Sequence, residues 1–324
     1  MGVAQAPAPI RFGLIGAGRI ARNQIAPAIH AAKRATLYAT ASRDVSRAEL
    51  TKPEHSYNSY DALLGDPNVD AVYVATHNGM HKELSIAAMR AGKHVICEKP
   101  LAMNARDCEE MARVAESTGM RLGEAFMYRH HPQIARAQAL VRSGAIGDVM
   151  AVEASFRFPL SNPDDVRMNA EWGGGSLLDV GCYCVSASRL FLGDSPIAMK
   201  AMAAIHPVKN VDTSLQGVLD YGAGRYAIIS CGFDSGVNQR VIVSGTAGVL
   251  ELNQPFKSWM GRPRILIQTK DRTKTIDFEA INTFALEIDD LAGAIVEGRE
   301  PLVEVRDATA NMRILDSLAD AARD

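Results

Sequence analysis

Aromatic residues are scarce in this sequence, at 6% of 324 residues, and neither sign of charge dominates, since the formal net charge at pH 7 is -2. A chain so close to neutral has no electrostatic attraction to polyanions, so we expect neither a nucleic-acid partner nor an anionic membrane surface. No apolar run reaches the length needed to cross a bilayer. Residues 1–9 also lack the basic and apolar pattern of a secretory signal, so we expect a cytoplasmic protein that acts on a small molecule.

Cysteine is also sparse: the chain has five, an odd number for a disulfide framework. Reduced thiols are typical of a reducing compartment. Cys182 and Cys184 are spaced too closely for a zinc-binding pair and have no matching second pair, so we expect them to pack inside a helix. We expect no metal.

The N-terminal part of the chain alternates short apolar runs with helical patterns. Continuously apolar runs are typical of parallel strands covered on both faces, and the repeat of strand and helix predicts a doubly wound sheet. The expected strands are residues 10–15, 36–41, 71–75, 94–98 and 120–125. The helix after the second run looks short, because Pro53 would stop it.

The pattern changes near Pro132, where helices at residues 132–142 and 177–192 are followed by alternating strands. Glycine-containing turns between those strands, at 221–224 and 245–248, predict hairpins of an antiparallel sheet. The sequence therefore predicts an α/β protein. A Rossmann domain at residues 1–125 precedes an α+β domain with a large, mostly antiparallel sheet at residues 126–324.

A glycine-rich turn follows the first expected strand and opens a helix, which is the context that gives such a motif meaning. Gly16 allows the tight turn, Gly18 lets the backbone approach a pyrophosphate, and Ala21 permits close packing of the helix. With Arg19 and Ile20 between them, the helix start would direct its N–H groups at the phosphates. We therefore expect a bound dinucleotide.

The second strand ends in Ser42 and Arg43, where NAD enzymes usually place a carboxylate on the ribose. A hydroxyl and a guanidinium suit a 2′-phosphate, which favours NADP over NAD, with NAD still possible. Asp44 lies too far round the turn to replace the missing carboxylate. The alternative is that Arg43 is only a solvated surface charge.

A lysine stands at the carboxyl end of the fourth strand, where open α/β sheets bind ligands. It is Lys99, and the following Pro100 restricts its backbone or gives a cis bond. On the later helix, Asp179 and Tyr183 are four residues apart and share one face. Gly181 between them indicates that some group approaches the backbone there.

Four motifs occur in order along the chain: residues 16–21, Ala75 and Thr76 with Asn78 and His81, residues 91–95 leading into Glu98-Lys99-Pro100, and residues 173–181. With these motifs the chain resembles the Gfo/Idh/MocA oxidoreductase family over essentially its whole length. A histidine stands in many members where this chain has Tyr183, and that departure, with residues 124–129, resembles the branch of dimeric dihydrodiol dehydrogenases and NADP-dependent xylose dehydrogenases. Another departure is His77 after Thr76, where the family often has proline.

The resemblance implies catalytic roles for Lys99, Tyr183 and Asp179, in hydride transfer between a nicotinamide and a sugar, polyol or cyclic trans-diol. A tyrosine can exchange the hydroxyl proton if a nearby ammonium lowers its pKa from ~10. At ~4 Å and an effective dielectric of ~20 such an ammonium supplies roughly 4 kcal/mol, about three pKa units. Asp179 would orient the substrate hydroxyl or Lys99.

The resemblance also implies further contacts and an oligomer. Arg129, Phe156 and Phe158 are candidate substrate residues, although the two phenylalanines would suit an ordinary core equally well. The broad second sheet is expected to bury one face in a homodimer or higher homo-oligomer. The implied cofactor contacts are Gly16, Gly18, Arg19, Ile20, Ala21, Ser42, Arg43, Thr76, His77, Asn78, His81, Glu98 and Lys99.

Two other functions fit the glycine turn. A non-catalytic sensor would bind the dinucleotide and regulate a partner, but it would not need Lys99, Asp179 and Tyr183 together. A methyltransferase could place S-adenosylmethionine on the same turn, and Ser42 with Arg43 argues against it.

Overall fold

The computed structural model describes residues 8–323, which divide into two compact units. The first comprises the chain up to Leu101, Arg106–Met127 and Asn282–Arg306, and the second comprises Ala102–Ala105, Tyr128–Ile281 and the C-terminal segment from Asp307. The sequence-based division at residue 125 puts residues 282–306 in the other domain, and that division stays a prediction.

The first unit is built on a six-stranded sheet in the order β3-β2-β1-β4-β5-β6, in which every neighbouring pair is parallel. The order reverses between β1 and β4, the place where doubly wound sheets bind dinucleotides. The apolar runs of the sequence form the central strands, which are almost fully buried. The strands are β1 (Ile10–Ile15), β2 (Ala35–Ala41), β3 (His55–Tyr57), β4 (Ala71–Val74), β5 (His94–Glu98) and β6 (Leu122–Ala125).

Helices connect these strands, and most end where the sequence supplies glycine or proline. α4 is followed by Gly92 and α5 by Gly119, both with positive φ, as expected for helix C-termini. The helical segments are η1 (a π-helical turn, Ala21–Ile25), α1 (Ala26–Ala31), α2 (Val45–Glu49), α3 (Tyr60–Leu64), η2 (Asn78–Met80), α4 (His81–Arg90) and α5 (Ala105–Thr118). After β6, η3 (Met127–His130) begins at the last residue of this stretch, and its other residues belong to the second unit.

α8 (Thr283–Glu297) joins this first unit from a distant part of the sequence. Asp289 accepts hydrogen bonds from the backbone N–H groups of Lys33 and Arg34, each at 2.8 Å. Arg34 also forms an ion pair with Glu297 at 2.7 Å. These contacts tie α8 to the connection between α1 and β2.

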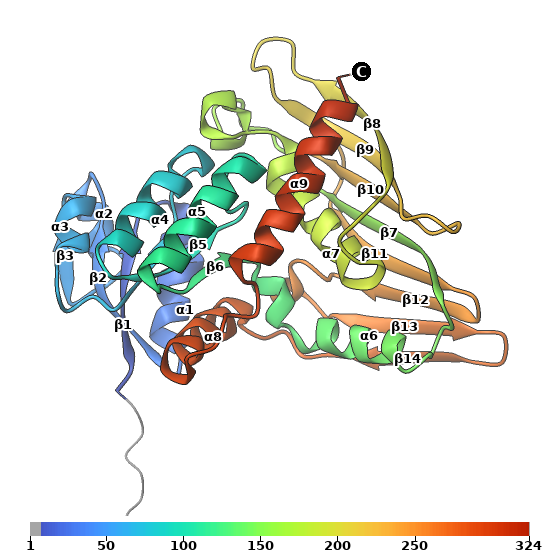
Figure 1. Ribbon diagram of the computed structural model, residues 1–324, viewed down its shortest axis with the longest axis horizontal. Helices are drawn as coiled ribbons and strands as arrows, with labels where there is room; N and C mark the ends of the chain where they lie inside the picture. The colour runs from blue at the N-terminus through green and yellow to red at the C-terminus, as the bar shows by residue number, and fades with distance from the viewer. Residues whose placement is uncertain (1–7, 324) are drawn as a thin grey trace, which may run out of the picture. The chain divides into compact units, whose positions relative to one another are not determined.

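The second unit contains an eight-stranded sheet in the order β14-β13-β12-β11-β7-β10-β9-β8 (Figure 1). Only β7 and β10 pair in parallel; the other neighbours are antiparallel, so the predicted α/β class with a mostly antiparallel second sheet is confirmed. The strands are β7 (Val149–Arg157), β8 (Ala198–Ile205), β9 (Asp212–Asp220), β10 (Tyr226–Gly232), β11 (Asn238–Gly245), β12 (Gly248–Asn253), β13 (Arg264–Thr269) and β14 (Thr273–Asp277).

One face of this sheet is covered by helices. Side chains alternate along β9 and β10 between buried and exposed positions, as in a sheet with one packed face. α7 packs against β7 and β10, α6 against β12 and β13, and Leu318 of α9 lies beside Gly217. The helical segments are α6 (Pro132–Arg142), η4 (Val166–Met168), η5 (Ala170–Trp172), η6 (a π-helical turn, Leu177–Gly181), α7 (Cys182–Leu192), η7 (Ser258–Met260) and α9 (Val305–Ala321).

Within residues 8–323, no helix combines the length and the apolar character that a membrane span requires.

Candidate functional site

The glycine turn lies at the carboxyl end of β1, where the sequence places it. Gly16 has φ +97°, and a Cβ on it would lie 2.7 Å from the carbonyl oxygen of Ala75 at the end of β4, so only glycine fits there. The backbone of Gly18 faces open space, and Gly18, Arg19 and Ile20 are exposed. The turn thus crosses the switch point of the sheet with its helix start accessible.

The helix that follows has no side chain capping its first turn. Uncapped N–H groups at a helix start form a natural site for an anion. Beside Gly16, the Oγ1 of Thr76 is buried and has no hydrogen-bond partner within residues 8–323. An uncapped helix start, an open backbone and an orphaned hydroxyl fit the phosphates of a dinucleotide.

Ser42 and Arg43 follow β2 next to this turn. Arg43 is exposed and makes no hydrogen bond or ion pair within the described part of the chain. Asp44 is already engaged: it caps α2 by accepting from the N–H of Ser46 at 3.1 Å, and it pairs with Arg47 at 3.2 Å. The end of β2 therefore offers the exposed guanidinium of Arg43. The hydroxyl of Ser42, which accepts from the N–H of Asp44 at 3.3 Å, keeps its own hydrogen to donate. These donors suit a phosphate better than a ribose hydroxyl.

His77 follows β4 close enough to Arg43 for their charges to interact. Burial, and then the positive charge of Arg43, lower the pKa of His77. We therefore expect a neutral His77 at neutral pH. Its contact with a cofactor, like that of Asn78 in η2, stays a prediction.

His81, another predicted cofactor residue, is fully buried. Its Nδ1 lies 2.9 Å from the carbonyl oxygen of Pro100, and its Nε2 lies 3.2 Å from the carbonyl oxygen of Thr76. Burial lowers its pKa to about 4. The structure therefore shows His81 tying the end of β4 to the turn after β5, and direct contact with a cofactor stays a prediction.

Lys99 follows β5 and is partly exposed, and the peptide bond to Pro100 is cis, one of the two conformations expected. The preceding Glu98 accepts a hydrogen bond from the hydroxyl of Tyr73 at 3.0 Å, and that hydroxyl also lies 3.4 Å from Glu287 of α8. Burial raises the pKa of Glu287 well above its ordinary value. The carboxylate of Glu98 is thus fixed by a hydrogen bond from a buried tyrosine.

Tyr183 lies in the second unit inside an aromatic cluster. Its ring centroid is 5.3 Å from that of Phe156, 5.4 Å from Phe256 and 5.7 Å from Tyr128, and only 4% of Tyr183 is exposed. Phe158 extends the cluster from Phe156 at 6.4 Å. The structure therefore brings the two predicted substrate phenylalanines together with Tyr183, and their contact with substrate stays a prediction.

Asp179 is paired with a residue that the sequence analysis did not single out. Nε of Arg167 donates to Oδ2 of Asp179 at 2.7 Å, and the same guanidinium binds Asp165 at 3.0 Å. The two carboxylates raise the pKa of Arg167. Arg167 also lies 5.8 Å from the ring centroid of Phe158, which connects Asp179 to the aromatic cluster.

Arg129 is engaged in an ion pair of its own. Its Nη1 lies 3.2 Å from Asp307, which also binds Arg189 at 3.2 Å. This pairing ties η3 to the start of α9. Contact of Arg129 with substrate stays a prediction.

The cysteine predictions concern the same helix. Cys182 and Cys184 are buried in α7, as predicted, and all five cysteines of the chain are free. A Cβ on Gly181 would lie 3.0 Å from the sulfur of Cys231, so the expected close approach to this backbone is confirmed.

Sequence reasoning missed Arg167, Asp212, Phe256 and Tyr73. Arg167 lies in the short 3₁₀ helix η4, and no periodicity relates it to Asp179. Asp212 lies 35 residues beyond the helix start that it contacts. Phe256 is a single aromatic residue that follows a strand, and no motif around it predicts a functional role. Tyr73 sits in an apolar run that predicts only a buried strand.

Family models match both parts of the chain. The Gfo/Idh/MocA oxidoreductase family with an NAD-binding Rossmann fold matches residues 10–126, and the Gfo/Idh/MocA C-terminal domain matches residues 134–251.

Individual relatives align over nearly full length. The NADP⁺-dependent D-xylose 1-dehydrogenase 2 of Haloferax volcanii is 37% identical over 96% of this chain and 97% of its own. The trans-1,2-dihydrobenzene-1,2-diol dehydrogenase of Xenopus tropicalis is 29% identical, covering 94% and 96%. A crystal structure of a 3-ketoreductase from Actinomadura kijaniata in complex with NADP and TDP-benzene superimposes with a TM-score of 0.91 at 32% identity, covering 97% and 98%.

Proposed function

Because the chain belongs to the Gfo/Idh/MocA oxidoreductase family, we propose that it transfers hydride between NADP and a hydroxyl or carbonyl carbon of a sugar-like substrate. The observation that carries this proposal is the accessible glycine turn at the end of β1, beside a phosphate-suited Ser42 and Arg43. The bound nicotinamide would accept or supply the hydride.

The residues of the first unit would bind and orient this cofactor. The N–H groups at the helix start around Gly18 and the hydroxyl of Thr76 would receive the pyrophosphate. Arg43 would bind the 2′-phosphate through charge-assisted hydrogen bonds. This set of donors explains a preference for NADP over NAD.

We assign the proton transfer to Tyr183 and Lys99. In oxidation the oxygen of Tyr183 accepts the proton of the substrate hydroxyl, and in reduction it returns a proton to the carbonyl oxygen. The ammonium of Lys99 would stabilise the negative charge that develops on the substrate oxygen, the role that membership of the family implies for it. Asp179, which Arg167 binds, would accept a hydrogen bond from a substrate hydroxyl rather than donate a proton.

The class of substrate rests on the relatives. D-xylose and a trans-dihydrodiol appear in the names of two of them, and the third is a ketoreductase. We therefore propose a sugar, a polyol or a cyclic trans-diol as substrate. The aromatic cluster around Tyr183 would exclude water from its hydroxyl.

The test is a fluorescence titration with NADPH and NADH, followed by a panel of sugars and diols with the preferred cofactor. We expect tighter binding of NADPH and turnover of at least one polyhydroxylated substrate. Tight binding without turnover on a broad panel would favour a non-catalytic sensor, and absence of binding would contradict the proposal.

We also propose that two copies of the chain associate through the open face of the eight-stranded sheet. Val218 of β9 and Ile228 of β10 are direct neighbours across the strands and are 44% and 46% exposed, and Met202 of β8 is 79% exposed. Apolar side chains gathered on one face are typical of an oligomer interface. Sedimentation should show a dimer, and a monomer at micromolar concentration would contradict this arrangement.

The cytoplasm is the location that we propose. Its support is the state of the five cysteines, all of which are free thiols in buried positions. Fractionation of cells that express the tagged chain would test it.

A further inference from the structure

The helix that carries Asp179 and Tyr183 begins without a cap of its own. Ser176 precedes η6, and its side chain makes no capping hydrogen bond to this helix. The first N–H groups of a helix need acceptors, especially where the helix start is buried. Ser176 is fully buried and Leu177 is 4% exposed, so solvent cannot serve that purpose.

The acceptor comes from another element. Asp212, the first residue of β9, accepts a hydrogen bond from the N–H of Leu177 at 2.7 Å. The same oxygen, Oδ2, accepts from the hydroxyl of Ser176 at 2.6 Å. A carboxylate at a helix N-terminus also interacts favourably with the helix dipole. One side chain of the sheet thus holds the first residues of this helix.

The glycines before the helix make this approach possible. Gly175 has φ +113°, and a Cβ on it would lie 2.2 Å from Oδ1 of Asp212. A Cβ on Gly174 would lie 2.4 Å from the carbonyl oxygen of Arg167. Gly175 therefore makes room for the carboxylate, and Gly174 makes room for the loop whose Arg167 binds Asp179.

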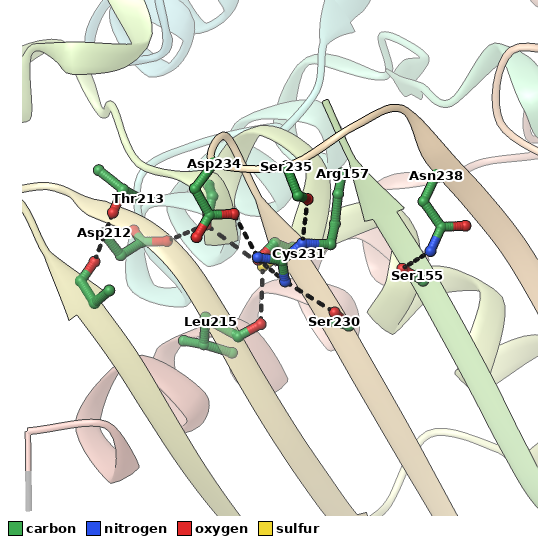
Figure 2. A network of polar contacts seen from close by, with 12 residues as sticks. Ser155, Arg157, Asp212, Thr213, Leu215, Ser230, Cys231, Asp234, Ser235 and Asn238 are labelled. Carbon is green, nitrogen blue, oxygen red and sulfur yellow. Dashed lines mark hydrogen bonds and ion pairs between the residues drawn. The ribbon is translucent and has the colours of Figure 1, made fainter. Parts of the chain in front are cut away.

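The surroundings of Asp212 restrict its movement. Cys231 of β10 places its sulfur 3.6 Å from the hydroxyl of Ser176. Figure 2 shows Asp212 near Cys231, with Arg157 and Asp234 in the same network of polar contacts. Burial raises the pKa of Asp212, and the hydrogen bonds from Ser176 and Leu177 oppose that rise.

We propose that Asp212 is a positioning residue for the hydride-transfer reaction, because its carboxylate fixes the start of the helix that presents Asp179 and Tyr183. Asp179 is two residues after Leu177, and its N–H bonds to the carbonyl oxygen of Gly175 at 3.1 Å. A shift at Leu177 is therefore transmitted directly to Asp179 and, one turn later, to Tyr183. This inference rests on the proposed function.

The test compares Asp212→Ala and Asp212→Asn with a matched control, Asp220→Asn. Asp220 ends the same strand and also accepts a backbone hydrogen bond, from Gly222 at 2.7 Å, but it does not touch the helix. Displacement of reacting groups by ~1 Å can cost about 100-fold in rate. We expect kcat to fall about 10- to 100-fold in Asp212→Ala, with the Kd of NADPH within twofold of wild type.

Asp212→Asn keeps an oxygen that can accept both hydrogen bonds, so it should recover kcat to within about fivefold of wild type. Asp220→Asn should equal wild type. A wild-type kcat in Asp212→Ala would overturn the inference. Equal losses in both Asp212 variants, in step with NADPH affinity and folded fraction, would also overturn it, because they indicate a general structural defect.

If Asp212→Ala does not fold, Ser176→Ala replaces it, since this variant removes one donor and leaves the carboxylate. A kcat lowered about threefold or more at unchanged NADPH affinity would support the inference, and an unchanged kcat would overturn it. A wild-type protein that turns over no substrate would instead overturn the proposed function.

Discussion

Arg167 donates from Nε to Oδ2 of Asp179 at 2.7 Å, and it does so from η4, twelve residues away in the sequence. A carboxylate bound by a guanidinium is a stable hydrogen-bond acceptor and a poor proton donor. The pairing therefore supports the proposed division of roles, in which Asp179 would orient the substrate and Tyr183 would exchange the proton.

Replacement of Arg167 by alanine should remove one ion-pair partner of Asp179 and leave cofactor binding intact. We expect kcat/KM for the substrate to fall about 10- to 100-fold, because the orienting group loses its geometry. Steady-state kinetics with saturating NADP would measure this. Arg323→Ala, which breaks an exposed ion pair with Asp320, is the control and should change nothing. Equal values of kcat/KM for the two variants would show that Arg167 does not position Asp179.

Replacement of Arg43 by alanine should weaken NADP selectively. A charge-assisted hydrogen bond contributes roughly 1.5–3 kcal/mol, so the Kd of NADPH should rise about 10- to 100-fold while that of NADH stays constant. Arg47→Ala is the control, since Arg47 is exposed and paired with Asp44. An equal rise in the Kd of NADPH and of NADH would show that Arg43 does not bind the 2′-phosphate.

Replacement of Gly175 by alanine should be more costly than its φ of +113° alone explains. Gly193 provides the comparison, because its φ is +97° and a Cβ there would meet no atom within 4 Å. Gly193→Ala should lower the free energy of unfolding by about 1–2 kcal/mol, because only the backbone conformation disfavours alanine there. Gly175→Ala should lower it by about 3 kcal/mol or more, because Asp212 must also move. Equal losses in denaturant titrations would argue against the close approach.

Glu287 should make the protein less stable as the pH rises. Burial raises its folded pKa well above the ordinary value of 4.5, so the unfolded chain releases a proton that the folded chain keeps. The free energy of unfolding therefore falls as the pH increases above 4.5, up to the folded pKa. Glu287→Gln removes this titration, and its stability should decline less between about pH 5 and about pH 8.

The control for this prediction is Glu83→Gln, at an exposed position of α4. It should follow the wild-type dependence on pH. The free energy of unfolding is measured by urea titration at each pH. If it depends on pH in Glu287→Gln as it does in wild type, the buried carboxyl does not hold its proton in the folded state.

The sequence predicted the framework of the fold because its signals are local. β1 and β5 match the expected ranges, since buried parallel strands are continuous apolar runs bounded by turns. β3 was not expected because it has only three residues, whereas the hairpin predicted at residues 245–248 is confirmed, since that turn joins β11 to β12.

The site was predictable only where its residues belong to local motifs. The glycine turn and Lys99 lie at strand ends, and Asp179 and Tyr183 lie on one helix. Asp212 and Arg167 reach that helix through tertiary contacts, which neither periodicity nor spacing records. His81 shows the converse: a motif placed it near the cofactor site, and the structure shows its two ring nitrogens buried next to two backbone carbonyl oxygens.

The most direct test of the account is NADP-dependent turnover by wild type, Tyr183→Phe and Lys99→Ala, measured together with NADPH affinity. General acid–base catalysis contributes about 100- to 10,000-fold, so Tyr183→Phe should lose at least about 100-fold in kcat and still bind NADPH with the wild-type Kd. Lys99→Ala should lose turnover in the same way. A Tyr183→Phe protein with wild-type turnover would contradict the account.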